Sequence, residues 1–70
     1  MTRVEVEAIV RSVLREYGIR PDIRRIALFA REWKIEVVDI DGVTKTLQVF
    51  DSSPQVMRAS IISALELEVE

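Results

Sequence analysis

The chain has 70 residues, of which 49% are apolar and 31% are charged, with a net charge of −2 and neither cysteine nor histidine. This composition is typical of a folded domain, and it excludes disulfides, the usual zinc sites, thiol chemistry and hydrolytic triads that need histidine. We expect one domain over residues 1–70 with a small core, which acts by binding rather than by catalysis and needs no metal or cofactor.

The first predicted element is a helix that begins after Thr2. Thr2 followed by Glu5 has capping-box spacing, in which each side chain accepts a hydrogen bond from an unpaired backbone N–H of the first turn. Gly18 predicts a left-handed helix end, with Ile19 packing back on Leu14. The apolar residues between these caps share one arc of about 140° at about 100° per residue: Val6, Ile9, Val10, Val13, Leu14 and Tyr17.

Residues 23–30 fit two templates. With a period of two, they form a strand that buries Ile26 and Leu28. With a period of 3.6, they form a helix with one apolar arc, which contains Ile23, Ile26, Ala27, Phe29, Ala30 and Trp33. We favour the strand, because Arg24 and Arg25 would otherwise lie at the positive end of a helix dipole. The helical alternative stays open.

Residues 37–50, VVDIDGVTKTLQVF, place two aspartates and a glycine between two β-branched runs. In an EF-hand loop with Gly42 at position six, Val37 and Gln48 would take the positions of the essential first and last carboxylates, so we expect no metal site. We predict a hairpin instead, whose three-residue loop, 40–42, pairs Asp39 with Val43 and uses Gly42 in the left-handed conformation. This register gathers one face of apolar residues, interrupted only by Lys45: Trp33, Ile35, Val37, Leu47 and Val49.

The last predicted element is a helix with Ser53 as its N-cap and Pro54 at its first position. Its core arc contains Met57, Ile61, Ile62, Ala64 and Leu65. The opposite side is smooth and uncharged where a solvated helix normally carries charges, which makes it a candidate self-association surface: Val56, Ala59, Ser60, Ser63 and Leu67. We expect the aromatic residues Tyr17, Trp33 and Phe50 to contribute to the core.

These elements predict an α+β fold of order α-β-β-β-α, a three-stranded antiparallel sheet with two helices packed on one face. The alternative is α-α-β-β-α. The predicted order resembles that of double-stranded RNA-binding domains, a likeness of topology alone. That family places a cluster of lysines at the start of its last helix, where this chain has SPQVMR with Arg58 as its single basic residue.

Positive charge gathers in the first half of the chain. Residues 1–34 hold eight Arg or Lys against five Asp or Glu, a net +3, whereas residues 35–70 hold two against seven, a net −5. Arginines together with an aromatic residue on an open sheet are one means of holding single-stranded nucleic acid. The candidate contacts are Arg11, Arg15, Arg24, Arg25 and Arg31.

The sequence thus predicts a non-enzymatic interaction or homodimerisation module, with itself or another protein as partner, and a nucleic-acid-binding domain as the alternative. No segment approaches the roughly 20 apolar residues that span a bilayer. The amino-terminal MTRVEVEAIVRS also lacks the apolar run of a signal peptide. We therefore expect a cytoplasmic protein that does not associate with membranes.

Overall fold

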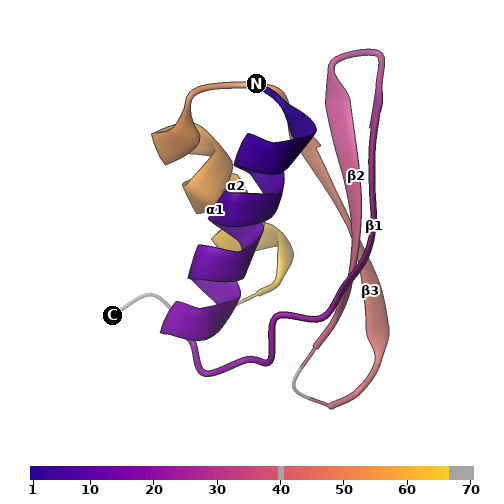
Figure 1. The fold of residues 1–70 in the computed structure, drawn as a ribbon, viewed down its shortest axis with the longest axis vertical. Helices are drawn as coiled ribbons and strands as arrows, with labels where there is room; N and C mark the ends of the chain where they lie inside the picture. The colour runs from indigo at the N-terminus through magenta and orange to yellow at the C-terminus, as the bar shows by residue number, and fades with distance from the viewer. Residues whose placement is uncertain (40, 67–70) are drawn as a thin grey trace.

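Two helices pack on one face of a three-stranded antiparallel sheet in the computed structural model of the chain, which describes residues 1–39 and 41–66 (Figure 1). The elements are α1 (Arg3–Glu16), β1 (Ile23–Phe29), β2 (Glu32–Val38), β3 (Thr44–Phe50) and α2 (Pro54–Ala64). The strands lie side by side in chain order, with α1 contacting β1 and α2 contacting β3. The predicted α-β-β-β-α architecture is confirmed, and the alternative with a helix over residues 23–30 is wrong.

Both ends of α1 carry the caps that the sequence predicts. The Thr2 hydroxyl accepts a hydrogen bond from the Glu5 N–H at 3.2 Å, and the Glu5 carboxylate accepts one from the Thr2 N–H at 2.9 Å. At the other end Gly18 has a φ of 71°, and the Ile19 N–H donates to the Leu14 carbonyl at 2.8 Å, as in a Schellman motif. The predicted apolar face packs into the core, with full burial of Val6, Val10, Val13 and Leu14 and partial burial of Ile9 and Tyr17.

Strand β1 contains a β-bulge that the alternation of its sequence does not reveal. Arg25 lies opposite Glu36, and the register shifts between Ile23 and Arg25, so that Arg24 is the extra residue. The bulge brings both Ile23 and Ile26 to the helical side of the sheet, where Ile26 is buried and Ile23 packs against the core. Without it, Arg24 would point toward the core.

The turn between β1 and β2 consists of Ala30 and Arg31, whose φ angles are 51° and 64°. Two left-handed residues make the type I′ turn that suits the twist of a hairpin, a turn in which Asn-Gly is the usual pair. Each residue other than glycine costs roughly 1 kcal/mol in this conformation. The Arg31 carbonyl accepts a hydrogen bond from the Asp51 N–H at 2.8 Å, which ties the turn to the end of β3.

The hairpin between β2 and β3 has the predicted register. The Asp39 N–H donates to the Val43 carbonyl at 2.9 Å, and Gly42 has a φ of 79°. The Asp39 carboxylate accepts hydrogen bonds from the N–H groups of Val43 and Asp41, at 3.0 and 2.9 Å. The bond from Val43 is the main reason that the pKa of Asp39 is lowered, and Lys45, 3.5 Å from the same carboxylate, lowers it further.

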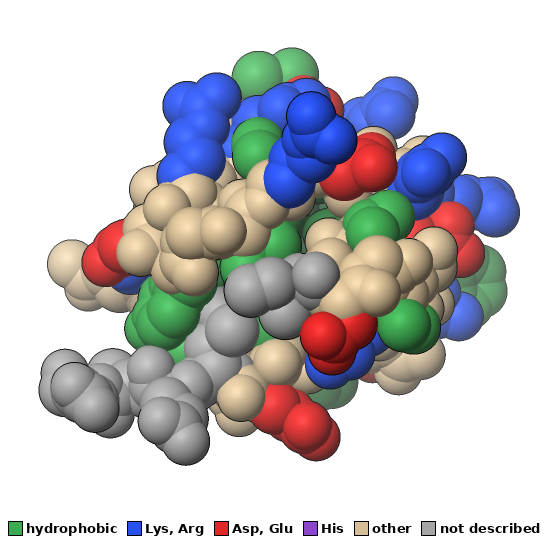
Figure 2. Space-filling view, turned by 90° about the horizontal axis from the view of Figure 1, so that it is seen from below, with side chains coloured by type: hydrophobic (Ala, Val, Ile, Leu, Met, Phe, Trp, Pro, Cys, Tyr) green, Lys and Arg blue, Asp and Glu red, His purple; other side chains and the backbone are tan. Residues whose placement is uncertain are grey.

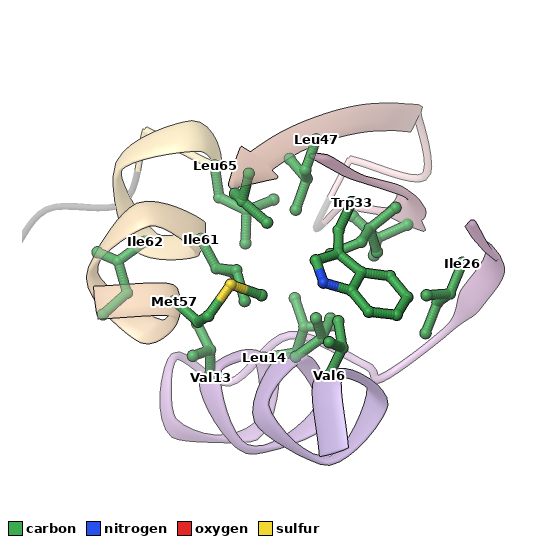
Figure 3. Close-up of a cluster of buried hydrophobic side chains, with 14 of the residues drawn as sticks. Val6, Val13, Leu14, Ile26, Trp33, Leu47, Met57, Ile61, Ile62 and Leu65 are labelled. Carbon is green, nitrogen blue, oxygen red and sulfur yellow. The ribbon is translucent and has the colours of Figure 1, made fainter. Parts of the chain in front are cut away.

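Helix α2 begins as predicted, with the Ser53 hydroxyl accepting a hydrogen bond from the Val56 N–H at 3.4 Å. Its core side buries Met57, Ile61, Ile62 and Leu65. In the close-up of Figure 3, Met57 and Ile61 point from α2 into the central cluster, which Trp33 and Leu47 enter from the sheet.

Three residues that we assigned to the core are exposed. Ala64 lies at the margin of the buried arc of α2 and is exposed to solvent. Leu28 lies opposite the buried Trp33 and so on the helical face, yet it is 50% exposed. The reason is that the β1–β2 hairpin extends past the helices (Figure 1). Phe50 is 70% exposed, because its strand position puts its side chain on the open face of the sheet.

Candidate interaction surfaces

The residues of α2 that we predicted for self-association lie together along one groove. Val56, Ala59, Ser60 and Ser63 line this groove, which has a volume of about 600 Å³, together with Gln48 of β3 and with Gln55 and Ala64. None of these seven described residues is charged. We call them the α2 groove. The fifth predicted residue, Leu67, lies outside the described residues.

The α2 groove faces away from the core because the helix buries its opposite side. Ser53 and Pro54 determine where the helix begins, and Met57 and Ile61 then point inward. The groove residues occupy the remaining arc, with Val56 53% exposed and Ser60 partly buried. The groove is therefore solvent-accessible and built mainly of short side chains, so that another backbone can approach it closely.

The groove lies beside the outer edge of β3, which has no strand partner within residues 1–39 and 41–66. Two hydrogen bonds, Asp39 N–H to Val43 and Asp51 N–H to Arg31, identify Val43 and Asp51 as residues whose backbone faces β2. Bonded positions alternate along an antiparallel pair, so every second residue between them also bonds β2. The intervening residues direct their N–H and C=O groups toward the edge: Thr44, Thr46, Gln48 and Phe50. Of these, the Phe50 carbonyl also accepts a hydrogen bond from the Ser52 hydroxyl at 3.2 Å.

One charged side chain lies near each end of β3, on the helical side of the sheet. Lys45 is 39% exposed, and its ammonium lies near Asp39. Asp51 accepts a hydrogen bond from the Trp33 indole N–H at 3.1 Å and lies 3.4 Å from the Met1 amino group. The bond from Trp33 is the main cause that lowers the pKa of Asp51, assisted by the amino group. Lys45 and Asp51 thus carry opposite charges at the two ends, and each already has a partner of opposite charge within the chain, Asp39 and the Met1 amino group.

The five candidate arginines do not form one surface. Arg11 and Arg15 lie on α1, Arg24 and Arg25 lie at the start of β1, and Arg31 lies in the turn at its far end. A strand of this length spans roughly 20 Å. Arg11 pairs with Glu7 at 3.4 Å and Arg24 with Asp22 at 3.6 Å. Figure 2 shows basic side chains gathered along one side of the molecule, with acidic side chains among them.

The open face of the sheet carries two exposed aromatic rings, and the sequence analysis did not predict that they lie close together. Phe29 is 77% exposed and Phe50 70%, and both lie opposite Glu32 in one cross-strand row. The predicted hairpin register already places Phe50 on the open face, because Phe50 lies two residues after Gln48 and alternate residues of a strand share a face.

The same face holds a shallow depression next to this row. It has a volume of about 240 Å³ and is lined by Arg25, Ala27, Lys34, Glu36 and Thr46. Two basic residues and one acidic residue thus surround a floor formed by a small side chain. Of the five candidate arginines, Arg25 alone lines this depression, and Arg11, Arg15, Arg24 and Arg31 lie outside it.

Within residues 1–39 and 41–66, no three Asp or Glu side chains cluster closely enough to hold a metal ion. Neither described helix is both long and apolar enough to cross a membrane. Comparison with models of known protein families, with curated proteins and with solved structures finds no match to this chain.

Proposed function

We propose that this chain is a non-catalytic, cytoplasmic interaction module whose partner is a second copy of itself. The observation that carries the proposal is the α2 groove, which is uncharged, solvent-accessible and adjacent to the edge of β3. A chain with 31% charged residues normally places charges on such a surface. A domain of this size also buries only about 60% of the surface of its unfolded chain, so that dimerisation adds stability.

Binding is favoured over catalysis by the chemistry of the same groove. Its lining offers hydroxyl, amide and aliphatic groups, with no acid, base or thiol among the described residues. General acid–base and nucleophilic catalysis both need a titratable or activated group within hydrogen-bond reach of the substrate. The groove is suited to covering a protein surface.

Sedimentation at several concentrations tests this proposal. We expect the wild-type chain to dimerise and both Ala59→Glu and Ser60→Glu to be monomeric, because each buries a carboxylate without a partner in the interface. Ala8→Glu is the matched control, since Ala8 is an exposed alanine on the other helix. At about 500 μM, even a dimer with a dissociation constant of about 1 mM raises the average mass measurably. A wild-type chain that is monomeric at this concentration contradicts the proposal. A dimer that Ala59→Glu does not dissociate also contradicts the proposal.

A second candidate function, the binding of single-stranded nucleic acid, is supported by the open sheet face. Phe29 and Phe50 offer exposed rings on which bases can stack, and Arg25 and Lys34 are placed to contact phosphates. Glu32 lies between the two rings and opposes an anionic ligand. We rank this function second for that reason.

Titration of labelled RNA and DNA at two salt concentrations tests the second candidate. Phosphate contacts weaken steeply as salt rises, and Phe29→Ala should remove a stacking contribution of about 1 to 3 kcal/mol. Val4→Ala is the control, because Val4 is equally exposed but lies on α1. The absence of binding at low salt excludes this function.

A further inference from the structure

We propose that two copies of the chain join by antiparallel pairing of their β3 strands, with Gln48 on the two-fold axis, into one six-stranded sheet. This inference rests on the proposed self-association and specifies how it occurs. Its starting point is the edge of β3, where four residues present backbone donors and acceptors without a strand partner in the described chain: Thr44, Thr46, Gln48 and Phe50. An edge of this kind is a template for another strand.

The two edges of the sheet differ in how they are protected. The β1 edge carries a bulge and two adjacent arginines, Arg24 and Arg25, both devices that prevent edge-to-edge pairing. The β3 edge has only Lys45, and residues 46–50, TLQVF, contain no charge and no proline. The pairing of residues 44–50 with β2 is regular, without a bulge. Strand addition is therefore expected at β3 and not at β1.

The parity of the strand limits the possible registers. The residues that face the edge must bond one another across a two-fold axis, which keeps their side chains on the open face in both copies. With the axis at Gln48, Lys45 lies opposite Asp51 of the second copy, a pair of opposite charges that occurs twice. An axis at Leu47 would place Lys45 opposite Val49 instead. Lys45 and Asp51 already pair with Asp39 and the Met1 amino group, but their side chains stay 39% and 31% exposed, so each can meet a second opposite charge. This favours the axis at Gln48.

The exposed Phe50 has a place in the same arrangement. With Gln48 on the axis, Phe50 lies opposite Thr46 of the second copy on the open face, and this pair also occurs twice. Pairs of an aromatic and a β-branched residue are favourable across strands. The 70% exposure of Phe50 would fall on dimerisation.

The α2 groove meets a geometric need of this junction. Figure 1 shows that α2 runs in the opposite direction to β3, so the two copies of α2 also run antiparallel across the axis. Paired strands lie about 4.8 Å apart, whereas packed helices need about 8 to 10 Å between their axes. Helices that flank such a junction must present short side chains. Ala59, Ser60 and Ser63 are among the residues of α2 that line this side.

Cross-linking of single-cysteine variants tests the pairing directly, because the natural chain has no cysteine. Gln48→Cys should form an intermolecular disulfide under mild oxidation, since residues at this position of the dimer have Cα atoms about 5.5 Å apart, within disulfide reach. Thr46→Cys is the matched control on the same edge, two residues from the axis. We expect it to cross-link at least about tenfold more slowly, because its Cα separation exceeds about 7 Å.

A second variant blocks the edge without touching the fold. Gln48→Pro removes an N–H that faces outward, so the bonds of β3 to β2 remain. We expect the dissociation constant of the dimer to rise at least tenfold, with an unchanged far-UV circular dichroism spectrum, whereas Gln48→Ala should leave the dimer intact.

The possible outcomes separate this inference from the proposed function. A dimer by sedimentation in which Gln48→Cys does not cross-link overturns the strand pairing and leaves self-association standing. Faster cross-linking of Thr46→Cys than of Gln48→Cys overturns the register. A wild-type chain that remains monomeric overturns both.

Discussion

The two hairpins of the sheet are built on opposite principles. The β2–β3 turn contains residues suited to it, with Gly42 in the left-handed conformation and the Asp39 carboxylate accepting two backbone N–H groups. The β1–β2 turn places Ala30 and Arg31 in the same left-handed region, with neither glycine nor asparagine. One turn is stabilised by its own residues and specifies the register. The other is imposed by the strands that it joins.

This difference identifies what stabilises each hairpin. The β1–β2 turn costs roughly 2 kcal/mol of backbone strain, which the burial of Trp33 and Ile26 on the paired strands must offset. Its tip also bears the exposed Leu28 and Phe29 beyond the helices. The β2–β3 turn, in contrast, stabilises its hairpin. Substitutions in the two turns should therefore have effects of opposite sign.

The largest effect is expected for Gly42→Val. A β-branched residue at a φ of 79° is strained, and we predict a loss of about 2 to 3 kcal/mol in the free energy of unfolding, measured by urea denaturation. A Cβ atom at Gly42 would meet nothing within 4 Å, so the loss comes from the backbone and not from a clash. Gly42→Asn is the control and should cost much less, because asparagine tolerates this conformation. Equal losses for both variants contradict this interpretation.

The opposite sign is expected at the other turn. Replacing Ala30 by Asn together with Arg31 by Gly supplies the usual residues of a type I′ turn and should raise the free energy of unfolding by about 1 to 2 kcal/mol. Arg31→Ala alone keeps both strained positions and serves as the control. If the double variant is no more stable than the wild type, the strain that we assign to this turn is absent.

A smaller effect concerns pH and the Asp39 carboxylate. The hydrogen bond from the Val43 N–H is the main cause that lowers its pKa in the folded chain. Its contribution to stability is therefore complete above the unfolded pKa of about 3.9 and is lost as the pH falls through the lower folded value. Urea denaturation between about pH 6 and pH 2 should show a shallower loss of stability for Asp39→Asn than for the wild type. Parallel curves for the two proteins would remove this role of Asp39.

The last prediction concerns calcium, which should not change the melting temperature of the chain. The DIDG segment occurs in a hairpin whose turn is held by hydrogen bonds from Asp41, Gly42 and Val43 to Asp39. We predict that millimolar calcium leaves the melting temperature of the chain unchanged in differential scanning calorimetry, with magnesium at the same ionic strength as the control. A rise in melting temperature with calcium alone would reveal an ion site at this turn.

Local chemistry made the caps and one hairpin predictable. Thr2 with Glu5, Gly18 with Ile19, and Ser53 with Pro54 each satisfy backbone groups within a few residues, so their pattern is legible in the sequence. The β2–β3 register was predictable because a slip of one residue would move a whole apolar face into solvent.

The candidate sites were only partly predictable. Four of the five residues proposed for self-association line one groove, because their spacing on a helix places them on one arc. The groove also includes Gln48, which joins it only because α2 packs over β3. The candidate arginines were chosen because positive charge gathers in the first half of the chain, and the structure places them on α1, on β1 and in a turn. The distance between residues of different elements is not contained in local periodicity.

The sequence by itself thus determined the start of each helix, the end of α1, the hairpin register and the apolar faces, since each depends on neighbours within a turn or a strand pair. Tertiary structure alone decided that residues 23–29 form a strand, because pairing with β2 outweighs an equally apolar helical arc. It also decided the bulge at Arg24, the strained turn at Ala30 and Arg31, and the exposure of Leu28. The bulge and the turn follow from the pairing of β1 with β2, whereas the exposure of Leu28 follows from where the helices stop covering the sheet.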